Sequence, residues 1–141
     1  MQYIITCPKP IDTSITLPAS KSISNRALII QALTKGGMIP ENLSDCDDTE
    51  VIIHGLNKQS DIIDIKAAGT AMRFMTAYLS ATNSENTITG TERMKHRPIG
   101  ILVDALRDLG AEIEYVGEEG FPPLHIRGKQ LEGGTLEIPG N

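Results

Sequence analysis

Residues 17–30, LPASKSISNRALII, change abruptly from strand-like to helical sequence. The alternating segment ITLP leads into a turn of small residues, and apolar positions at helical spacing follow from Ser24 onward. This order is typical of a strand that enters a helix through a tight turn. Because the chain repeats it farther on, the sequence predicts layered α/β structure.

Periodicity and turn residues predict a regular alternation of elements along the rest of the chain. The expected strands are residues 14–20, 38–44, 61–66, 86–94 (a strand with its turn), 111–116, 123–128 and a last one within 136–141. The expected helices are residues 24–35, 45–58, 71–81 and 98–109, with glycine stops at Gly36, Gly37 and Gly110. The strands at 111–116 and 123–128 should form a hairpin-like pair.

Composition and charge exclude several classes of protein. The 141 residues carry a net charge of -5, and aromatic residues make up 4% with no Trp. We therefore expect no nucleic-acid interface, which needs a basic face and usually aromatic stacking platforms. Cys7 and Cys46 have neither metal-ligand nor disulfide-framework spacing, and no apolar run reaches the roughly 20 residues that span a bilayer. We expect a cytoplasmic protein without a membrane segment.

Basic residues gather at the expected helix starts. In the first of these, Lys21 supplies a point charge, Ser22 a hydroxyl donor and Arg26 a planar donor fork one helical turn later. The unpaired N–H groups at a helix N-terminus also attract anions. This segment is predicted to bind a phosphate or carboxylate group.

Two later segments repeat the arrangement. AAGTAMR, residues 67–73, combines Gly69, which allows a ligand close to the backbone, with Thr70 and an arginine one turn into the helix. RMKHRP, residues 93–98, is the densest basic cluster, with Arg97 held just before a proline. Three such helix starts predict ligands that carry several phosphates or carboxylates.

Several standard catalytic motifs are absent from the sequence. It contains neither G-x-x-x-x-G-K-[ST] nor G-x-G-x-x-G, which argues against P-loop and dinucleotide-binding proteins. The three histidines lack metal-ligand spacing, and the acids of SDCDD fit helix capping. No nucleophile elbow surrounds Ser20, Ser22 or Ser24. We expect neither a metal site nor a serine nucleophile.

Three parts of the chain resemble one known family. They are similar to the N-terminal half of 5-enolpyruvylshikimate-3-phosphate synthase, also called 3-phosphoshikimate 1-carboxyvinyltransferase. The three parts are LPASKSISNRAL at residues 17–28, AAGTAMRF at 67–74, and GTERMKHRPIGILVDALRDLGAEIEY with GFPPLHIRG within 90–128. The similarity covers nearly the whole chain in the correct order. The lysine-serine helix start and the run RPIGILVDALR carry most of its specificity.

The resemblance implies the two-globe α/β fold of enolpyruvyl transferases, with repeated βαβαββ units, helices inside and sheets outside. Residues 1–14 would be a strand segment of a second globe, and residues 15–141 an incomplete N-terminal globe with substrate-binding turns. The family transfers the enolpyruvyl group of phosphoenolpyruvate to the 5-hydroxyl of shikimate 3-phosphate and releases phosphate, on the shikimate pathway to chorismate and aromatic amino acids. The resemblance implies no metal and no organic cofactor.

Six residues fall on the family's substrate-binding positions. Those for shikimate 3-phosphate are Lys21, Ser22 and Arg26. Those for phosphoenolpyruvate are Lys21, Gly69, Thr70 and Arg97. Lys21, shared by the two substrates, is the expected catalytic residue.

The sequence departs from the family's pattern near the second of these sites. Ala67 stands where the family usually has Asn, which removes a hydrogen-bonding side chain, and Phe74 stands where it often has Pro. The segment between Asp45 and Ala67 is also shorter than in the family. These differences change the expected shape of the phosphoenolpyruvate pocket.

The chain has roughly a third of the family's usual length, so we expect an N-terminal fragment that is inactive alone and that can self-associate through uncovered apolar faces. The parent protein is expected to be a monomer. Two other functions stay open. A UDP-N-acetylglucosamine enolpyruvyl transferase shares the chemistry, but it should carry Asn where this chain has Ser22. The second is a non-catalytic anion-binding module.

Overall fold

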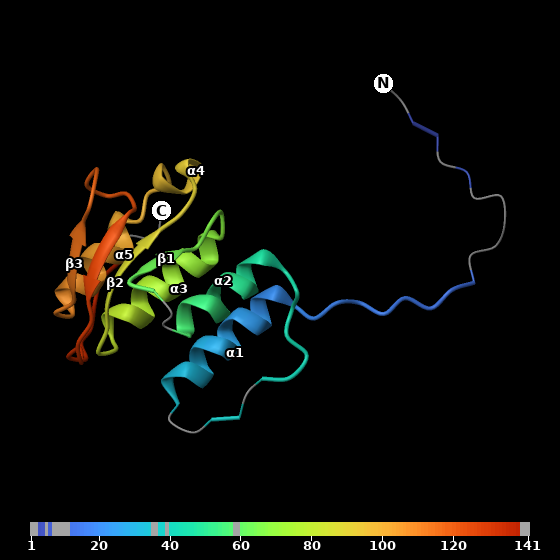
Figure 1. Cartoon of the computed structure of the whole chain (residues 1–141), viewed down its shortest axis with the longest axis horizontal. Coiled ribbons are helices and arrows are strands. Elements are labelled where there is room, and N and C mark those ends of the chain that lie inside the picture. The colour runs from blue at the N-terminus through green and yellow to red at the C-terminus, as the bar shows by residue number, and fades with distance from the viewer. Residues whose placement is uncertain are drawn as a thin grey trace.

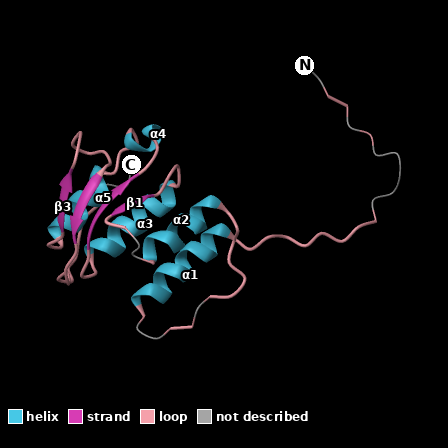
Figure 2. Cartoon of the chain, in the orientation of Figure 1, coloured by secondary structure: helices cyan, strands magenta, loops and turns pink. Residues whose placement is uncertain are grey.

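The computed structural model describes residues 3, 4, 6, 12–34, 37, 38, 40–57 and 60–138. Its helices are α1 (Lys21–Leu33), α2 (Asp47–Leu56), α3 (Gly69–Ser80), α4 (Glu92–Lys95) and α5 (Gly100–Asp108). Its strands are β1 (Ile62–Asp64), β2 (Glu85–Thr89), β3 (Glu112–Tyr115) and β4 (Leu124–Arg127). Figure 2 shows the sheet at one side of the body, with α1, α2 and α3 side by side next to it.

The four strands form one mixed sheet in the order β1-β2-β4-β3. β1 and β2 are parallel and are joined through α3, whereas β4 is antiparallel to both β2 and β3. The register places Ile63 opposite Ile88, Ile88 opposite Leu124, and Ile113 opposite Ile126. All five side chains are buried. Because successive side chains of a strand point to opposite faces, these apolar residues share one face of the sheet.

Helices cover this apolar face. α3 and α5 contact the sheet, and α2 and α1 pack on α3 (Figure 1). α3 is buried along most of its length, and Met72, Met75 and Leu79 are at most 1% exposed. Full burial of one such side chain contributes about 1.5–3 kcal/mol. A helix that is buried on most sides is expected where a sheet covers one side and other helices cover another.

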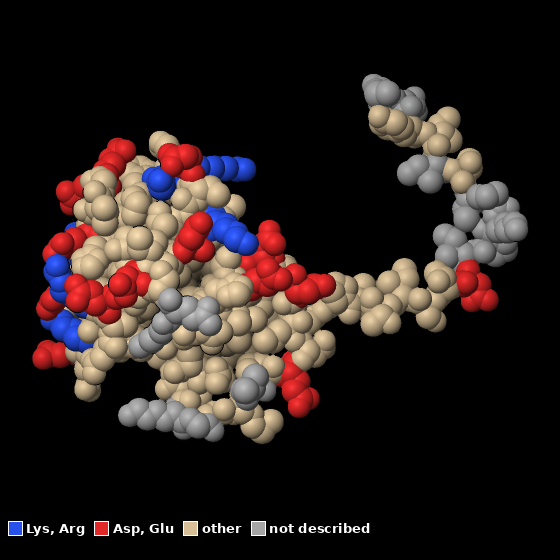
Figure 3. All heavy atoms as spheres, in the orientation of Figure 1, with Lys and Arg blue, Asp and Glu red and all other residues tan. Residues whose placement is uncertain are grey.

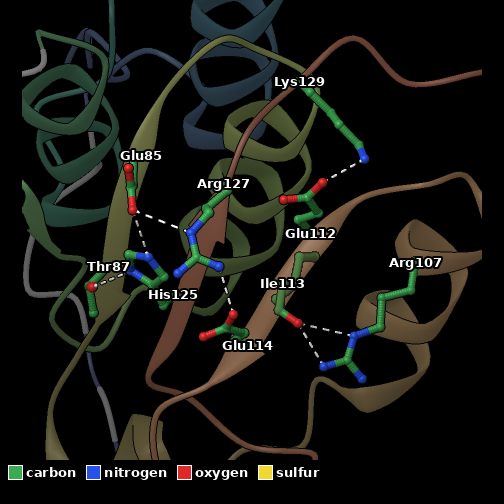
Figure 4. A network of polar contacts seen from close by, with 9 residues as sticks. All are labelled: Glu85, Thr87, Arg107, Glu112, Ile113, Glu114, His125, Arg127 and Lys129. Atoms are coloured by element: carbon green, nitrogen blue, oxygen red, sulfur yellow. Dashed lines mark hydrogen bonds and ion pairs between the residues drawn. The ribbon is translucent and has the colours of Figure 1, made fainter.

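The opposite face of the sheet is polar (Figure 4). Arg127 lies 3.4 Å from the carboxylate of Glu85 and 2.7 Å from that of Glu114, and Lys129 lies 2.8 Å from that of Glu112. The hydrogen bond from Lys129, together with its charge, holds the pKa of Glu112 below the ordinary value of 4.5. Because these ion pairs are exposed, solvent screens their attraction strongly. This face is therefore suited to contact with solvent.

Three of the predicted strands are wrong within the described residues. Residues 14–20 and the described parts of 38–44 and 136–141 form neither helix nor strand. Ile15 and Leu17 are 77% and 80% exposed. A strand needs a neighbour for its backbone hydrogen bonds, and the four-stranded sheet contains none of these segments. The predicted strand and turn at 86–94 divide into β2 and the short helix α4, which the sequence did not predict.

The other predicted elements are confirmed, although their ends differ. The first helix begins at Lys21 rather than Ser24, because the Ser20 hydroxyl accepts a backbone N–H at the helix start. The fourth expected helix, α5, ends before Gly110, whose φ of +93° is a conformation that favours glycine. The predicted hairpin is formed by β3 and β4. Gly36 lies outside the described residues.

The succession β1-α3-β2-α5-β3-β4 is one βαβαββ unit, with α4 inserted before α5. One face of its sheet carries helices and the other is polar, which confirms the fold class that the resemblance implies. Residues 12–18 are exposed and lead away from the body (Figure 1). The assignment of residues 1–14 to a second globe and of 15–141 to an N-terminal globe stays a prediction.

Candidate functional site

The start of α1 places two of the predicted ligand-binding residues beside a second helix start. Lys21 is the first residue of α1, and its Nζ lies 3.1 Å from Oδ1 of Asp48 in the first turn of α2. The two side chains are 49% and 21% exposed. Ser22 follows on α1 and is exposed. Two helices thus begin side by side, and each contributes unpaired N–H groups and partial positive charge to the region around Lys21.

Two buried hydrogen bonds hold α1 against α2 and against the segment that leads into α2. The Ser24 hydroxyl accepts the backbone N–H of Ser44 at 2.9 Å, and the Thr49 hydroxyl donates to Oδ1 of Asn25 at 2.8 Å. Each such bond contributes about 0.5–1.5 kcal/mol net. Among the described residues, Nδ2 of Asn25 is buried without a hydrogen-bond partner. The polar residues after Lys21 therefore fix one helix start against the other.

Cys46 occupies the N-cap position of α2, next to these contacts. Burial raises the pKa of its thiol, but hydrogen bonds with Ser44, Thr49 and the backbone outweigh burial, and the pKa lies below its ordinary value of 9.0. Its Sγ lies 3.4 Å from Oγ1 of Thr49. The thiol belongs to the polar contacts at the helix start. Cys7 lies outside the described residues.

Arg26 lies one turn into α1 and reaches toward α3. Its Nη1 donates to the backbone carbonyl of Ser22 at 2.9 Å. Its Cζ lies 5.3 Å from the centre of the Phe74 ring, in the second turn of α3. A guanidinium at this distance over an aromatic face makes a cation–π contact. This contact joins the second turns of the two helices.

The start of α3 brings Gly69 against Arg97. A Cβ at Gly69 would collide with the guanidinium of Arg97, whose Cζ would be only 2.9 Å away, so the absence of a side chain allows this approach. Nη2 of Arg73 donates to the carbonyl of Pro98 at 3.0 Å, and its Nη1 donates to that of Gly69 at 3.5 Å. Arg73 therefore ties the loop that carries Arg97 to the helix start.

An open depression of about 410 Å³ lies beside this helix start. Its lining residues are Ala67, Thr91, Arg93, Met94 and Arg97. Two guanidinium groups in one depression suit a small anion such as a phosphate or carboxylate. Thr70 is half-buried at the second position of α3 and is not one of the lining residues.

These contacts bring the predicted site residues to one end of three neighbouring helices. Lys21 and Arg26 lie on α1, and Phe74 connects Arg26 to the helix that Gly69 begins. Gly69 and Phe74 are separated by about 7.5 Å along the helix axis. Two cationic regions therefore lie next to each other, each at a helix N-terminus. Each region can attract an anionic group.

The contacts of Asp48, Phe74 and Arg93 were not predicted from the sequence. Asp48 does lie in the first turn of α2, where capping acids are expected, but it also pairs with Lys21. Arg93 belongs to the basic cluster at 93–98, and only the fold shows that it shares a depression with Arg97. Figure 3 shows basic side chains projecting at the top of the body with acidic side chains near them. A net negative charge is thus compatible with local cationic clusters.

The described residues contain neither a metal-binding cluster nor a membrane-spanning helix. No group of three or more His, Cys, Asp or Glu side chains within them could hold a metal ion. No described helix has both the length and the apolar character needed to cross a membrane.

Comparison with known proteins gives consistent results. The model of the family described as EPSP synthase (3-phosphoshikimate 1-carboxyvinyltransferase) matches residues 5–60 and 55–141. A 3-phosphoshikimate 1-carboxyvinyltransferase of Bacteroides fragilis is 62% identical over 141 residues, which are 100% of this chain and 34% of the relative. One of Tolumonas auensis is 40% identical over 157 aligned residues, covering 93% of this chain and 37% of the relative.

A solved structure supports the fold. EPSP synthase from Acinetobacter baumannii superposes with a TM-score of 0.79 at 24% identity, over 89% of this chain and 34% of that chain. The present chain spans about a third of the length of these relatives. The family model matches well over half of the chain, and the order of helices and strands agrees with it. The chain therefore belongs to the EPSP synthase family.

Proposed function

We propose that this chain forms part of the active site of a 3-phosphoshikimate 1-carboxyvinyltransferase. This enzyme transfers the enolpyruvyl group of phosphoenolpyruvate to the 5-hydroxyl of shikimate 3-phosphate and releases phosphate, as a step of the shikimate pathway. The observation that carries the proposal is the gathering of Lys21, Arg26 and Arg97 at neighbouring helix starts. Family membership supports the choice of substrates, both of which carry phosphate.

In this proposal α1 binds shikimate 3-phosphate. Lys21 and Ser22 donate from its first turn, and Arg26 donates from the second, so three donors of different shape converge on one ligand. The ion pair with Asp48 holds the Lys21 ammonium at the helix start before a ligand arrives. Lys21 also contacts phosphoenolpyruvate, which makes it the catalytic residue of this chain.

The start of α3 binds phosphoenolpyruvate. Its backbone N–H groups and the Arg97 guanidinium supply positive charge, while Gly69 leaves the space in which Arg97 lies. Thr70, the second residue of α3, adds a hydroxyl near the same helix start. Ala67, in the depression beside Arg97, offers no side-chain hydrogen bond where the family usually has Asn. Phosphoenolpyruvate is therefore held mainly by arginine and backbone groups.

The chemistry needs this concentration of positive charge because both substrates are anions. The 5-hydroxyl oxygen bonds to C2 of phosphoenolpyruvate, the hydroxyl proton is lost to a base, and a proton adds to C3 to give a tetrahedral intermediate. Loss of phosphate from C2 and of a proton from C3 then leaves the enol ether. Lys21, Arg26 and Arg97 hold the two anions together and offset their repulsion, which lowers the barrier through orientation and electrostatics.

The groups that move these protons belong, in our proposal, to sequence that corresponds to the rest of the relatives. This chain spans 34% of the Bacteroides fragilis relative. A closed cleft is also needed to exclude water from the reacting centre. We therefore propose that this chain alone binds substrates without turning them over.

The test is a chimera in which this chain replaces the matching segment of the Bacteroides fragilis relative. Phosphate release is measured with both substrates for the chimera, the unaltered relative and this chain alone. We expect the chimera to approach the rate of the unaltered relative and the chain alone to show no turnover. A folded chimera without activity would refute the proposed function. Turnover by the chain alone would refute its dependence on further sequence.

A further inference from the structure

We propose that Phe74 is a positioning residue that holds the Arg26 guanidinium ready to receive a phosphate group. The proposal rests on the proposed function, in which Arg26 binds shikimate 3-phosphate. It adds a residue of α3 to a binding site that otherwise lies on α1. Phe74 is therefore expected to affect the affinity for one substrate although it does not contact that substrate.

The geometry holds Arg26 in two places. The Phe74 ring covers one face of the guanidinium, with Cζ 5.3 Å from the ring centre. Nη1 donates to the backbone carbonyl of Ser22 at 2.9 Å. Among the described residues, neither Nε nor Nη2 of Arg26 has a hydrogen-bond acceptor. A guanidinium held by its face and one N–H group keeps its remaining edge available, and such an edge can bind phosphate through two parallel hydrogen bonds.

The surroundings explain why a ring is needed at this position. An apolar groove of about 290 Å³ runs between α1 and α3, and Arg26 and Phe74 are the first residues of the two helices to line it. Arg26 is exposed, so little besides these contacts restricts its long side chain. A side chain that is already ordered loses less conformational freedom on binding. The Phe74 ring thus reduces the conformational entropy that the Arg26 side chain loses when it binds a ligand.

The matched set of variants is Phe74→Leu, which removes the ring, Phe74→Tyr, which keeps it, and Tyr115→Leu as a control. Tyr115 makes the comparable contact elsewhere, with its ring centre 5.0 Å from Cζ of Arg107. Arg107 also donates Nε and Nη2 to the carbonyl of Ile113, at 3.1 and 2.7 Å (Figure 4). The control therefore loses a cation–π contact outside the candidate site.

The first measurement needs no ligand. The Nε–Hε signal of Arg26 is followed by 15N NMR in the whole 141-residue chain. We expect Phe74→Leu to speed the exchange of this proton with water and the rotation of the guanidinium, and Phe74→Tyr to leave both near the unaltered values. Unchanged Arg26 dynamics in a folded Phe74→Leu chain would overturn the proposal. If circular dichroism shows that this variant is unfolded, Phe74→Met is judged by the same criterion.

The second measurement uses steady-state kinetics of the chimera described above. We expect Phe74→Leu to raise the KM for shikimate 3-phosphate about two- to fivefold, which corresponds to loss of one exposed cation–π contact. The KM for phosphoenolpyruvate should change less, and Phe74→Tyr and Tyr115→Leu should leave both KM values near the unaltered ones. Equal changes in both KM values, or no change, would overturn the proposal. An inactive unaltered chimera would instead refute the proposed function, and the NMR result would still decide the role of Phe74.

Discussion

Gly69→Ala provides the sharpest test of the pairing between the start of α3 and Arg97. An ideal Cβ at this position would lie 2.9 Å from Cζ and 3.1 Å from Nη2 of Arg97, and still closer to Nη1. Ordinary contacts between such atoms are about 3.5–4.0 Å, so the guanidinium must retreat by roughly 1 Å. Because it is the exposed end of a flexible side chain, it can do so without unfolding the protein.

This displacement should weaken phosphoenolpyruvate binding and not the fold. A misplacement of about 1 Å in a binding group can cost up to about 100-fold in rate, and we expect kcat/KM for phosphoenolpyruvate to fall about 10- to 100-fold in the chimera. The free energy of unfolding should stay unchanged or rise by up to about 1 kcal/mol, because Ala is a better helix former than Gly. The KM for shikimate 3-phosphate should change little.

The assay is steady-state phosphate release with each substrate varied in turn, together with urea unfolding of the 141-residue chain. Gly100→Ala is the matched control, because Gly100 also begins a helix and its added Cβ would find its nearest neighbour at an ordinary 3.6 Å. We expect the control to keep kcat/KM for phosphoenolpyruvate within about twofold of the unaltered chimera. If Gly69→Ala also stays within that range, Arg97 does not bind phosphoenolpyruvate in the position seen here.

Three further predictions concern stability and are measured by urea unfolding of the chain. Thr49→Ala should destabilise the chain by about 1–3 kcal/mol, because it removes the hydrogen bond to Oδ1 of the buried Asn25, whose Nδ2 already lacks a partner. Thr49→Ser should restore most of the lost stability. Gly128→Ala should cost about 1–3 kcal/mol or more, since its Cβ would overlap two backbone carbonyl oxygens near the end of α3. The lowered pKa of Glu112 stabilises the fold above the ordinary pKa of 4.5, and this stability is lost as the pH falls through the folded-state pKa. Glu112→Gln should remove this part of the dependence of the unfolding free energy on pH. An unchanged pH profile would contradict the ion pair with Lys129.

All the helices except α4 could be predicted, apart from their ends, because their signals are local. Apolar positions at helical spacing mark most of α1, and Gly110 lies two residues after the last residue of α5. The alternating segments at 14–20 and 38–44 carried an equally clear local signal, yet neither is a strand within the described residues. Alternation reports that a segment can present one apolar face. It does not report whether a neighbouring strand is available, which depends on residues distant in sequence.

The same distinction between local signals and long-range contacts applies to the candidate site. The charged groups of Lys21, Arg26 and Arg97 were predictable because their positions relative to helix starts are visible in the sequence. Their partners were not, because Asp48 and Phe74 lie on other helices, and only the packing of α1 against α2 and α3 brings them together. The sequence can therefore indicate which side chains are candidates for binding anions, but not what holds those side chains in place.

The arginines show why this distinction matters for function. Arg73 and Arg97 both lie near the start of α3 and look equivalent as positive charges. In the structure, Arg73 donates to two backbone carbonyls, whereas Arg97 lies over a glycine beside an open depression. A guanidinium whose donors face carbonyls positions the backbone, and one that faces open space can bind a ligand. Substitutions near the site, such as Ala67 and Phe74, should accordingly act through the geometry of the neighbouring arginines as much as through direct contact with substrates.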